Sequence, residues 1–239
     1  TIGFVPTLGA LHEGHASLIR KSKRKSDVTV CSIFVNPTQF NDPKDLKKYP
    51  RTLEADSALL ESLKTDILYL PIKDEVYPSD IDTRVDVDFG DLFTVMEGAH
   101  RPGHFDGVVQ VVKRLLDIVK PDFLYMGQKD FQQFTLIQFM IDRLSLPVEL
   151  VVCKIKREEH GLAMSSRNER LVPDIRKRAS IIRKTMLAVK RKVNTKKFSE
   201  IKDYAIKRMT IPDFKPEYFS LVWAGEIRLI DNIILKRKE

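Results

Sequence analysis

Apolar runs and helical patterns alternate through the first two thirds of the chain. Five short apolar runs have the length of buried strands, and they cover residues 2–5, 28–35, 67–70, 123–126 and 148–155. Helical patterns begin between these runs, near His12, Leu53, Val108 and Phe131. Strands that alternate with helices indicate βαβ units with parallel strands. Several runs are apolar at both odd and even positions, as expected when helices cover both faces of a sheet.

This pattern predicts an α/β fold, with a Rossmann-like doubly wound parallel sheet and a smaller C-terminal α+β domain. We place the boundary so that residues 1–155 form the larger domain and residues 156–239 form the smaller one. Residues 85–89, Val-Asp-Val-Asp-Phe, alternate between apolar and polar side chains. This alternation predicts an edge strand or an outlying hairpin.

The 239 residues have a globular composition, and no apolar run approaches the roughly 18 residues that a membrane span needs. No leader segment opens the chain, so we expect a soluble cytoplasmic protein without a membrane partner. Because the chain starts on a strand and without Met, we expect residues before Thr1 to have been lost. Cys31 and Cys153 lie in strand-like runs, which predicts two buried free thiols.

The formal net charge of +8 is concentrated between residues 170 and 208, which hold 14 Lys and Arg against 3 Asp and Glu. Apolar positions at helical spacing make this stretch amphipathic, and no aromatic-rich stacking surface accompanies the charge. We interpret it as a solvated helix face near an anionic substrate, and expect no nucleic-acid partner. A tRNA-binding module is the alternative, because a basic surface attracts phosphates.

The segment His12-Glu13-Gly14-His15 opens the first predicted helix. The two imidazoles lie on one face of the first turn, where free N–H groups and the helix dipole favour an anion. This pattern is typical of a site for nucleotide phosphates. Two alternatives stay open. The histidines could bind zinc with His100 or His104 as a third ligand, or they could only cap the helix.

Polar residues gather where the predicted strands end. Pro6 and Thr7 follow the first strand, residues 36–40 follow the second, and residues 127–130 follow the fourth. Because the carboxyl ends of parallel strands meet at one edge of a sheet, we expect these loops to line a single pocket.

A second polar cluster, at residues 161–168, follows the last predicted strand of the larger domain. Ser165 and Ser166 can donate hydrogen bonds, and Arg167 can neutralise the charge of a departing pyrophosphate. A Ser-type turn that leads into a helix is the alternative interpretation of the same residues.

Seven ordered blocks span nearly the whole chain: VPTLGALHEGH at 5–15, SIFVNPTQF at 32–40, YPRT at 49–52, RPGHFDGV at 101–108, GQKDFQQ at 127–133, GLAMSSRN at 161–168 and RLIDN at 228–232. Together they resemble the pantoate–β-alanine ligases (pantothenate synthetases), a family of the HxGH nucleotidylyltransferase superfamily, to which class I aminoacyl-tRNA synthetases belong. Leu8 and His160 depart from the family pattern, which has Met and Asp there. Residues 211–229 are shorter than the pattern, so we expect residues to be missing around Leu221.

The resemblance implies an enzyme with two half-reactions. Pantoate and Mg-ATP would give an enzyme-bound pantoyl adenylate and pyrophosphate, and β-alanine would then attack the acyl carbon to give pantothenate and AMP. Pantoate's own carboxylate is the nucleophile, so catalysis would rest on positioning and charge stabilisation. The resemblance also implies Mg²⁺ as cofactor, ATP as co-substrate and a homodimer. Another HxGH nucleotidylyltransferase with a different acceptor is the enzyme alternative.

By motif position, the resemblance implies roles for individual residues. The catalytic set is His12, His15, Lys129, Ser165, Ser166 and Arg167. The ATP-binding set is Pro6, Thr7, Leu8, Gly127, Lys129, Asp130, Met164, Ser165, Ser166 and Arg167. Pantoate would contact Leu8, Asn36, Gln39, Phe40 and Gln133. Asp56 would bind Mg²⁺, with an ordinary surface acid as the alternative. Residues 1–155 would bind ATP and pantoate, and residues 156–239 would act as a lid.

Overall fold

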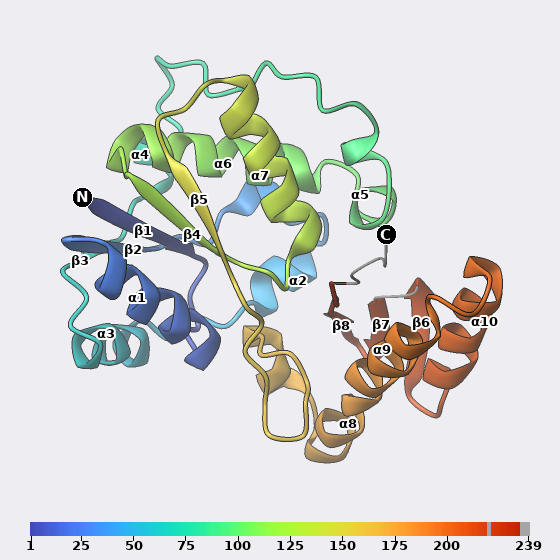
Figure 1. The fold of residues 1–239 in the computed structure, drawn as a ribbon. Coiled ribbons are helices and arrows are strands. Elements are labelled where there is room, and N and C mark those ends of the chain that lie inside the picture. Colours follow the sequence, from blue (N-terminus) through green and yellow to red (C-terminus); the bar gives the residue numbers. More distant parts are fainter. Residues whose placement is uncertain (219–220, 235–239) are drawn as a thin grey trace. The chain divides into compact units, whose positions relative to one another are not determined.

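The computed structural model describes residues 1–218 and 221–234, and the chain divides into two compact units (Figure 1). One unit runs from Thr1 to Lys154, and the other begins at Ile155. Each unit has its own sheet and its own hydrophobic core. Phe219 and Ser220 lie outside the described residues, so the expectation of missing residues near Leu221 falls on that gap.

The N-terminal unit contains a five-stranded sheet in the order β3-β2-β1-β4-β5. Its strands are β1 (Ile2–Thr7), β2 (Val28–Ile33), β3 (Ile67–Tyr69), β4 (Phe123–Gly127) and β5 (Glu149–Cys153). All neighbouring pairs are parallel, which confirms the predicted doubly wound sheet. Because β1 pairs with both β2 and β4, the loops that follow these three strands leave the same edge of the sheet.

Helices connect the strands of this unit. They are α1 (Glu13–Lys25), α2 (Pro43–Lys48), α3 (Leu53–Ser62), α4 (Lys73–Val76), α5 (Glu97–His100), α6 (His104–Val119) and α7 (Phe131–Arg143), with the 3-10 turns η1 (Pro37–Gln39) and η2 (Gly90–Phe93). Three predicted helices begin within a residue of the expected position, whereas α6 begins a turn before Val108. The early start follows Gly103, whose positive φ of 78° ends the preceding turn.

Side chains on the two faces of the sheet enter separate cores. Phe4 and Leu124 pack with α6 and α7, whereas their chain neighbours Val5 and Tyr125 pack with α1 and α3. Figure 1 shows α1 and α3 on one side of the sheet and α6 and α7 on the other. Successive side chains of a strand point to opposite faces, so a sheet covered on both sides requires apolar residues at both parities.

Two free cysteines are buried in the core on the α1 side, which confirms the prediction of buried thiols. Burial raises the pKa of Cys31 to about 12, and burial also raises the pKa of Cys153. Both thiols therefore stay protonated at neutral pH and behave as small apolar side chains.

The prediction of a strand or hairpin at residues 85–89 is wrong, because this segment belongs to no sheet. Val85 and Val87 pack, partly buried, against the core formed with α6 and α7, and Phe89 is buried in it. The backbone N of Val87 bonds to the carbonyl of Val85 at 3.1 Å, a local contact that interrupts an extended ladder. An extended segment that lies on a core needs the same alternation as an edge strand.

The C-terminal unit combines helices with a small antiparallel sheet, as predicted. Its elements are η3 (Ser166–Arg170), α8 (Pro173–Arg178), α9 (Ser180–Lys192), α10 (Phe198–Met209), β6 (Phe214–Tyr218), β7 (Leu221–Ala224) and β8 (Ile227–Ile230). The core of this unit includes Ile182 and Met186 of α9, Met209 of α10, and Val222 of β7. The helices and the sheet therefore bury their apolar faces against each other.

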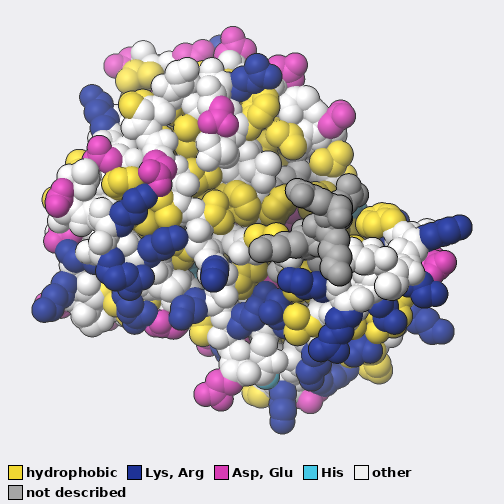
Figure 2. Space-filling view, viewed as in Figure 1, with side chains coloured by type: hydrophobic (Ala, Val, Ile, Leu, Met, Phe, Trp, Pro, Cys, Tyr) yellow, Lys and Arg dark blue, Asp and Glu magenta, His cyan; other side chains and the backbone are white. Residues whose placement is uncertain are grey.

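The basic stretch between residues 170 and 208 lies largely on α8, α9 and α10, which confirms its helical interpretation. Figure 2 shows Lys and Arg side chains gathered on the surface of this unit. Within the described residues, none of the helices combines the length and the apolar character needed to cross a membrane.

Candidate active site

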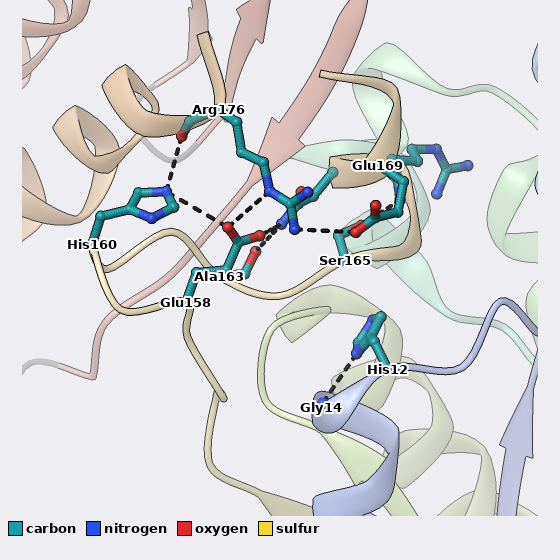
Figure 3. Close-up of polar contacts among 10 residues, drawn as sticks. His12, Gly14, Glu158, His160, Ala163, Ser165, Glu169 and Arg176 are labelled. Carbon is teal, nitrogen blue, oxygen red and sulfur yellow. Dashed lines mark hydrogen bonds and ion pairs between the residues drawn. The ribbon is translucent and has the colours of Figure 1, made fainter. Parts of the chain in front are cut away.

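A loop leads from the end of β1 into the first turn of α1. Gly9 has a φ of 79° in this loop, a conformation that residues with a Cβ rarely adopt. His12 then occupies the N-cap position, and its Nδ1 accepts a hydrogen bond from Gly14 N at 3.0 Å (Figure 3). In turn, Nδ1 of His15 accepts one from the backbone N of His12 at 3.3 Å. The two histidines form a capping box, so both of them cap α1.

These hydrogen bonds fix the tautomer of both rings. A ring nitrogen that accepts an N–H carries no proton, so the proton of each neutral imidazole is on Nε2. The two rings stack with their centroids 4.1 Å apart. Burial lowers the pKa of His15 well below its ordinary value, and the nearby His12 and Lys129 lower it further. Capping therefore leaves Nε2 of each ring as the position of the proton in the neutral imidazole.

Asp56 anchors the loop that carries these histidines. Its side chain is 2% exposed, and its Oδ1 accepts hydrogen bonds from Leu11 N at 2.7 Å and from the Thr52 hydroxyl at 3.0 Å. A Cβ added to Gly9 would lie 3.0 Å from Asp56 Oδ2, so the loop passes close to the carboxylate. The alternative of an ordinary surface acid is wrong, because Asp56 is buried beneath the loop.

Asn36 plays a similar part after β2. It is fully buried, and its Nδ2 donates to the carbonyl of Gly107 at 3.1 Å. Its Oδ1 accepts from Thr38 N at 3.3 Å and from the Tyr77 hydroxyl at 3.0 Å. A Cβ on Gly107 would lie 2.6 Å from the Thr38 carbonyl oxygen, so this position requires glycine. Asn36 thus fixes the turn η1, and both its polar groups already bond to the protein.

His104 supports the same turn, although the sequence indicated no such role for it. Its Nδ1 lies 2.6 Å from the carbonyl oxygen of Gln39, and its Nε2 lies 2.9 Å from Arg101 Nη1. Because the ring is buried and both its nitrogens have protein partners, His104 is unsuited to the zinc alternative. The described residues contain no group of three side chains that could hold a metal. The one sequence feature that could have indicated this supporting role is the position of His104 in the block at residues 101–108.

The loop after β4 and the start of α7 contribute the next group of residues. Lys129 Nζ lies 3.4 Å from Asp130 Oδ1, and the positive charge of Lys129 contributes to the lowered pKa of His15. Gln132 is buried, with Oε1 accepting from Glu97 N and Nε2 donating to two backbone carbonyls. Gln133 is only partly buried. The side chain of Gln132 is therefore fully hydrogen-bonded within the protein, whereas that of Gln133 is partly exposed to solvent.

The predicted residues of the C-terminal unit lie in and just before η3. Ser165 caps this turn, and its Oγ accepts a hydrogen bond from Arg167 N at 3.3 Å. Ser166 is buried, whereas Met164 is partly exposed. The alternative of a Ser-type turn is confirmed as a description of the backbone. The candidate residues thus form two groups, one at the sheet edge of the N-terminal unit and one at this turn.

Comparison with known proteins decides the family. The family profile described as pantoate-beta-alanine ligase matches residues 1–234. The chain belongs to the pantoate–β-alanine ligase family. The resemblance seen in the seven sequence blocks is therefore confirmed.

Curated relatives of this ligase family match nearly the whole chain. A pantothenate synthetase from Bdellovibrio bacteriovorus is 45% identical over 233 residues, which cover 98% of this chain and 91% of the relative. One from Porphyromonas gingivalis is 47% identical over 234 residues, which cover 97% of this chain and 82% of the relative.

Solved structures of the ligase family share the fold. A pantothenate synthetase from Thermus thermophilus superimposes with a TM-score of 0.89 at 38% identity, covering 97% of this chain and 92% of that one. A pantoate-beta-alanine ligase from Francisella tularensis, solved in complex with beta-gamma ATP and beta-alanine, has a TM-score of 0.81 at 37% identity. It covers 98% of this chain and 89% of the other.

Replacing His15 with Gln is expected to change how stability depends on pH. The lowered pKa means that folded His15 binds fewer protons than the unfolded chain below about pH 6.5. The wild type therefore loses stability as the pH falls through that value, by at most about 1.4 kcal/mol per pH unit from this group. Gln at this position can still complete the capping box but does not titrate.

Chemical denaturation between about pH 8 and pH 5 measures this difference. As the pH falls, the free energy of unfolding should decrease more for the wild type than for His15→Gln. His100→Gln, which removes an exposed histidine, serves as the control. Parallel curves for the wild type and His15→Gln would contradict a neutral His15.

Proposed function

We propose that this protein is an ATP-dependent ligase that condenses pantoate with β-alanine through a pantoyl adenylate and releases AMP and pyrophosphate. The observation that carries the proposal is the pair of stacked imidazoles that cap α1, with a donor at each Nε2. Family membership supports pantoate as the acceptor. The complex of the Francisella relative supports ATP and β-alanine as substrates.

In the first half-reaction, a carboxylate oxygen of pantoate attacks the α-phosphorus of ATP. An O–P bond forms, and the bond from phosphorus to the leaving pyrophosphate breaks. The Nε2–H groups of His12 and His15 and the ammonium of Lys129 donate to phosphate oxygens, where negative charge develops. The positive end of the α1 dipole acts in the same direction. No side-chain nucleophile takes part.

We assign the rest of ATP to the loops after β1 and β4. Pro6, Thr7 and Leu8 belong to the first loop, and Gly127 and Asp130 to the second. Nothing lies within 4 Å of the position that a Cβ on Gly127 would occupy, which leaves room for a ligand. The hydroxyl of Thr7 donates to the carbonyl of Ser32 at 2.7 Å, which holds the start of the first loop against β2. The Asp130 carboxylate accepts hydroxyl donors of the ribose.

Pantoate is assigned to the turn η1 and the first turn of α7. The amides of Gln39 and Gln133 hydrogen-bond its hydroxyl and carboxylate groups, and both side chains are partly exposed. Leu8 and Phe40 form the apolar wall for its gem-dimethyl group. Phe40 packs edge-on against Tyr49, with ring centroids 5.6 Å apart, which holds the wall in place. Asn36 orients this turn from below.

The C-terminal unit is assigned the part of a lid. Its Ser165, Ser166 and Arg167 donate to the triphosphate, and Met164 contacts the nucleotide. We thus divide the work between residues 1–155, which bind ATP and pantoate, and residues 156–239, which close over them. Closure would keep water from the reactive acyl phosphate.

Mg²⁺ fits the donor set around Asp56. Oδ1 of Asp56 is committed to Leu11 and Thr52, which leaves Oδ2 as the oxygen for a cation. Mg²⁺ is commonly bound by one or two carboxylates together with phosphate oxygens and waters. We therefore assign Asp56 as the protein ligand of Mg²⁺, which would neutralise charge on the triphosphate.

In the second half-reaction, the amine nitrogen of β-alanine attacks the acyl carbon of the adenylate. A C–N bond forms, the C–O bond to AMP breaks, and the amine loses a proton to solvent. The family resemblance also leads us to propose a homodimer in the cytoplasm. A tRNA-binding role for the basic helices would instead predict salt-sensitive RNA binding without ATP turnover.

His12→Asn is expected to lower pantoate-dependent exchange of pyrophosphate into ATP by about 100-fold or more, the effect of losing one donor to developing charge. Asn retains an oxygen that can cap α1 but has no group in place of Nε2–H. Exchange should require pantoate and Mg²⁺, and His100→Asn should behave like the wild type. Exchange that is independent of pantoate, or unchanged in His12→Asn, would refute the assignment.

Asp56→Asn is expected to fold but to need about 10-fold more Mg²⁺ for half-maximal exchange. Asn keeps the oxygen that accepts from Leu11 N, whereas Asp56→Ala leaves this N–H without its partner and should lose about 1–3 kcal/mol of unfolding free energy. Glu54→Gln, an exposed acid of the same helix, is the control. A wild-type Mg²⁺ requirement in Asp56→Asn would show that Asp56 only anchors the loop.

A further inference from the structure

We propose that Glu158 is a positioning residue for the turn that presents Ser165, Ser166 and Arg167, acting through the buried side chain of Asn168. This inference rests on the proposed function of that turn as a donor to the triphosphate. All the residues involved belong to the C-terminal unit.

Asn168 connects Glu158 to the turn. Its side chain is 1% exposed, and its Nδ2 donates to Glu158 Oε1 at 2.7 Å and to the carbonyl of Ala163 at 3.0 Å. A carboxylate and a carbonyl only accept, so the amide nitrogen must face them. Its Oδ1 is then buried without a hydrogen-bond partner among the described residues. The orientation of the Asn168 amide thus keeps the hydrogen bond to Glu158 although its Oδ1 has no partner among these residues.

The backbone of the turn depends on the same asparagine. Asn168 N donates to the carbonyl of Ser165 at 2.9 Å, and Leu171 N donates to the carbonyl of Asn168 at 3.0 Å. Arg167 N donates to Ser165 Oγ at 3.3 Å. Asn168 therefore closes η3 through its backbone and ties it down through its side chain. A shift of its amide would move the backbone that carries Ser166 and Arg167.

Arg176 holds the other oxygen of Glu158. Its Nε lies 2.9 Å from Glu158 Oε2, and its Nη2 lies 3.1 Å from Glu169 Oε1 (Figure 3). Burial alone would raise the pKa of Glu158, but hydrogen bonds from Arg176 and Asn168 hold it below its ordinary value. Glu158 is thus ionised at neutral pH. Its Oε2 accepts a hydrogen bond from Arg176 of α8, and its Oε1 accepts one from Asn168.

His160 joins this cluster at the position where the family pattern has Asp. Its Nε2 lies 2.9 Å from the carbonyl oxygen of Arg176 and 3.7 Å from Glu158 Oε2. Because a carbonyl only accepts, Nε2 carries a proton and donates to the last turn of α8. Figure 3 shows His160 and Arg176 on adjoining sides of the Glu158 carboxylate. His160 therefore makes a second contact between the Glu158 segment and α8.

A tight loop fixes Glu158 itself. Its backbone N donates to the carbonyl of Leu162 at 2.8 Å, and Gly161 N donates to the carbonyl of Glu158 at 2.8 Å. Gly161 has a φ of 102°, which favours glycine in this loop. The carboxylate thus projects from a constrained backbone toward Asn168. Through its bond to Asn168, it restricts the position of the turn at residues 165–167.

The test measures pantoate-dependent ATP–pyrophosphate exchange on the full chain. Glu158→Ala should lower kcat/KM for ATP by about 10- to 100-fold, the size of effect seen when a supporting contact behind a metal ligand is removed. The KM for pantoate should not change. Glu158→Gln keeps an oxygen for Asn168 and should recover most of the loss, and it also serves if the Ala variant fails to fold. Asp174→Asn, which breaks an exposed ion pair with Arg178 in α8, should leave exchange unchanged.

A double-mutant comparison separates positioning from general stabilisation. Arg167→Ala should lower exchange by itself. In the Arg167→Ala background, adding Glu158→Ala should lower exchange by less than about 3-fold, because both residues act through one turn. Equal losses from Glu158→Ala in both backgrounds, or folded Glu158→Ala with wild-type kcat/KM, would overturn the inference. Wild-type exchange in Arg167→Ala would overturn the proposed role of the turn and, with it, the inference. A normal Arg167→Ala loss beside an inert Glu158→Ala would overturn the positioning role alone.

Discussion

The hydrogen bond from Leu11 N to Asp56 Oδ1 is the constraint on which the loop that carries His12 and His15 depends. It joins the loop after β1 to α3 and so sets where α1 begins. The start of α1 determines which residues cap it, and here both caps are imidazoles. Because each Nδ1 is used by the backbone, the proton of each neutral ring is on Nε2. One buried carboxylate thus anchors the loop that leads into α1 and its two histidine caps.

The same design recurs at two other candidate site residues. Asn36 lies beneath the turn that carries Gln39, and Gln132 is packed beside Gln133. In each pair, a buried side chain with all its polar groups satisfied fixes the backbone, and the neighbouring side chain stays partly exposed. Catalysis by positioning needs such support, because small displacements of donors reduce their effect on the transition state.

The sequence predicted the sheet well, because the strands are short apolar runs, several of them apolar at both parities, and the helices between them have their own periodicity. It also predicted that the loops after β1, β2 and β4 leave one edge of the sheet, since parallel strands end at the same edge. It did not predict the supporting contacts, since these join residues far apart in the chain: 45 residues separate Leu11 from Asp56, and 71 separate Asn36 from Gly107. Residues 85–89 were misjudged because packing on a core and pairing at an edge impose the same alternation.

We expect the capped imidazoles to be neutral and protonated at Nε2 before any ligand binds. Long-range ¹H–¹⁵N correlation spectra of the ring nitrogens at about pH 7.5, assigned with His12→Asn and His15→Gln, test it directly. We expect the Nε2–H tautomer for both rings, and a change in their Nε2 resonances when Mg-ATP is added. Rings protonated at Nδ1, or doubly protonated at that pH, would contradict it.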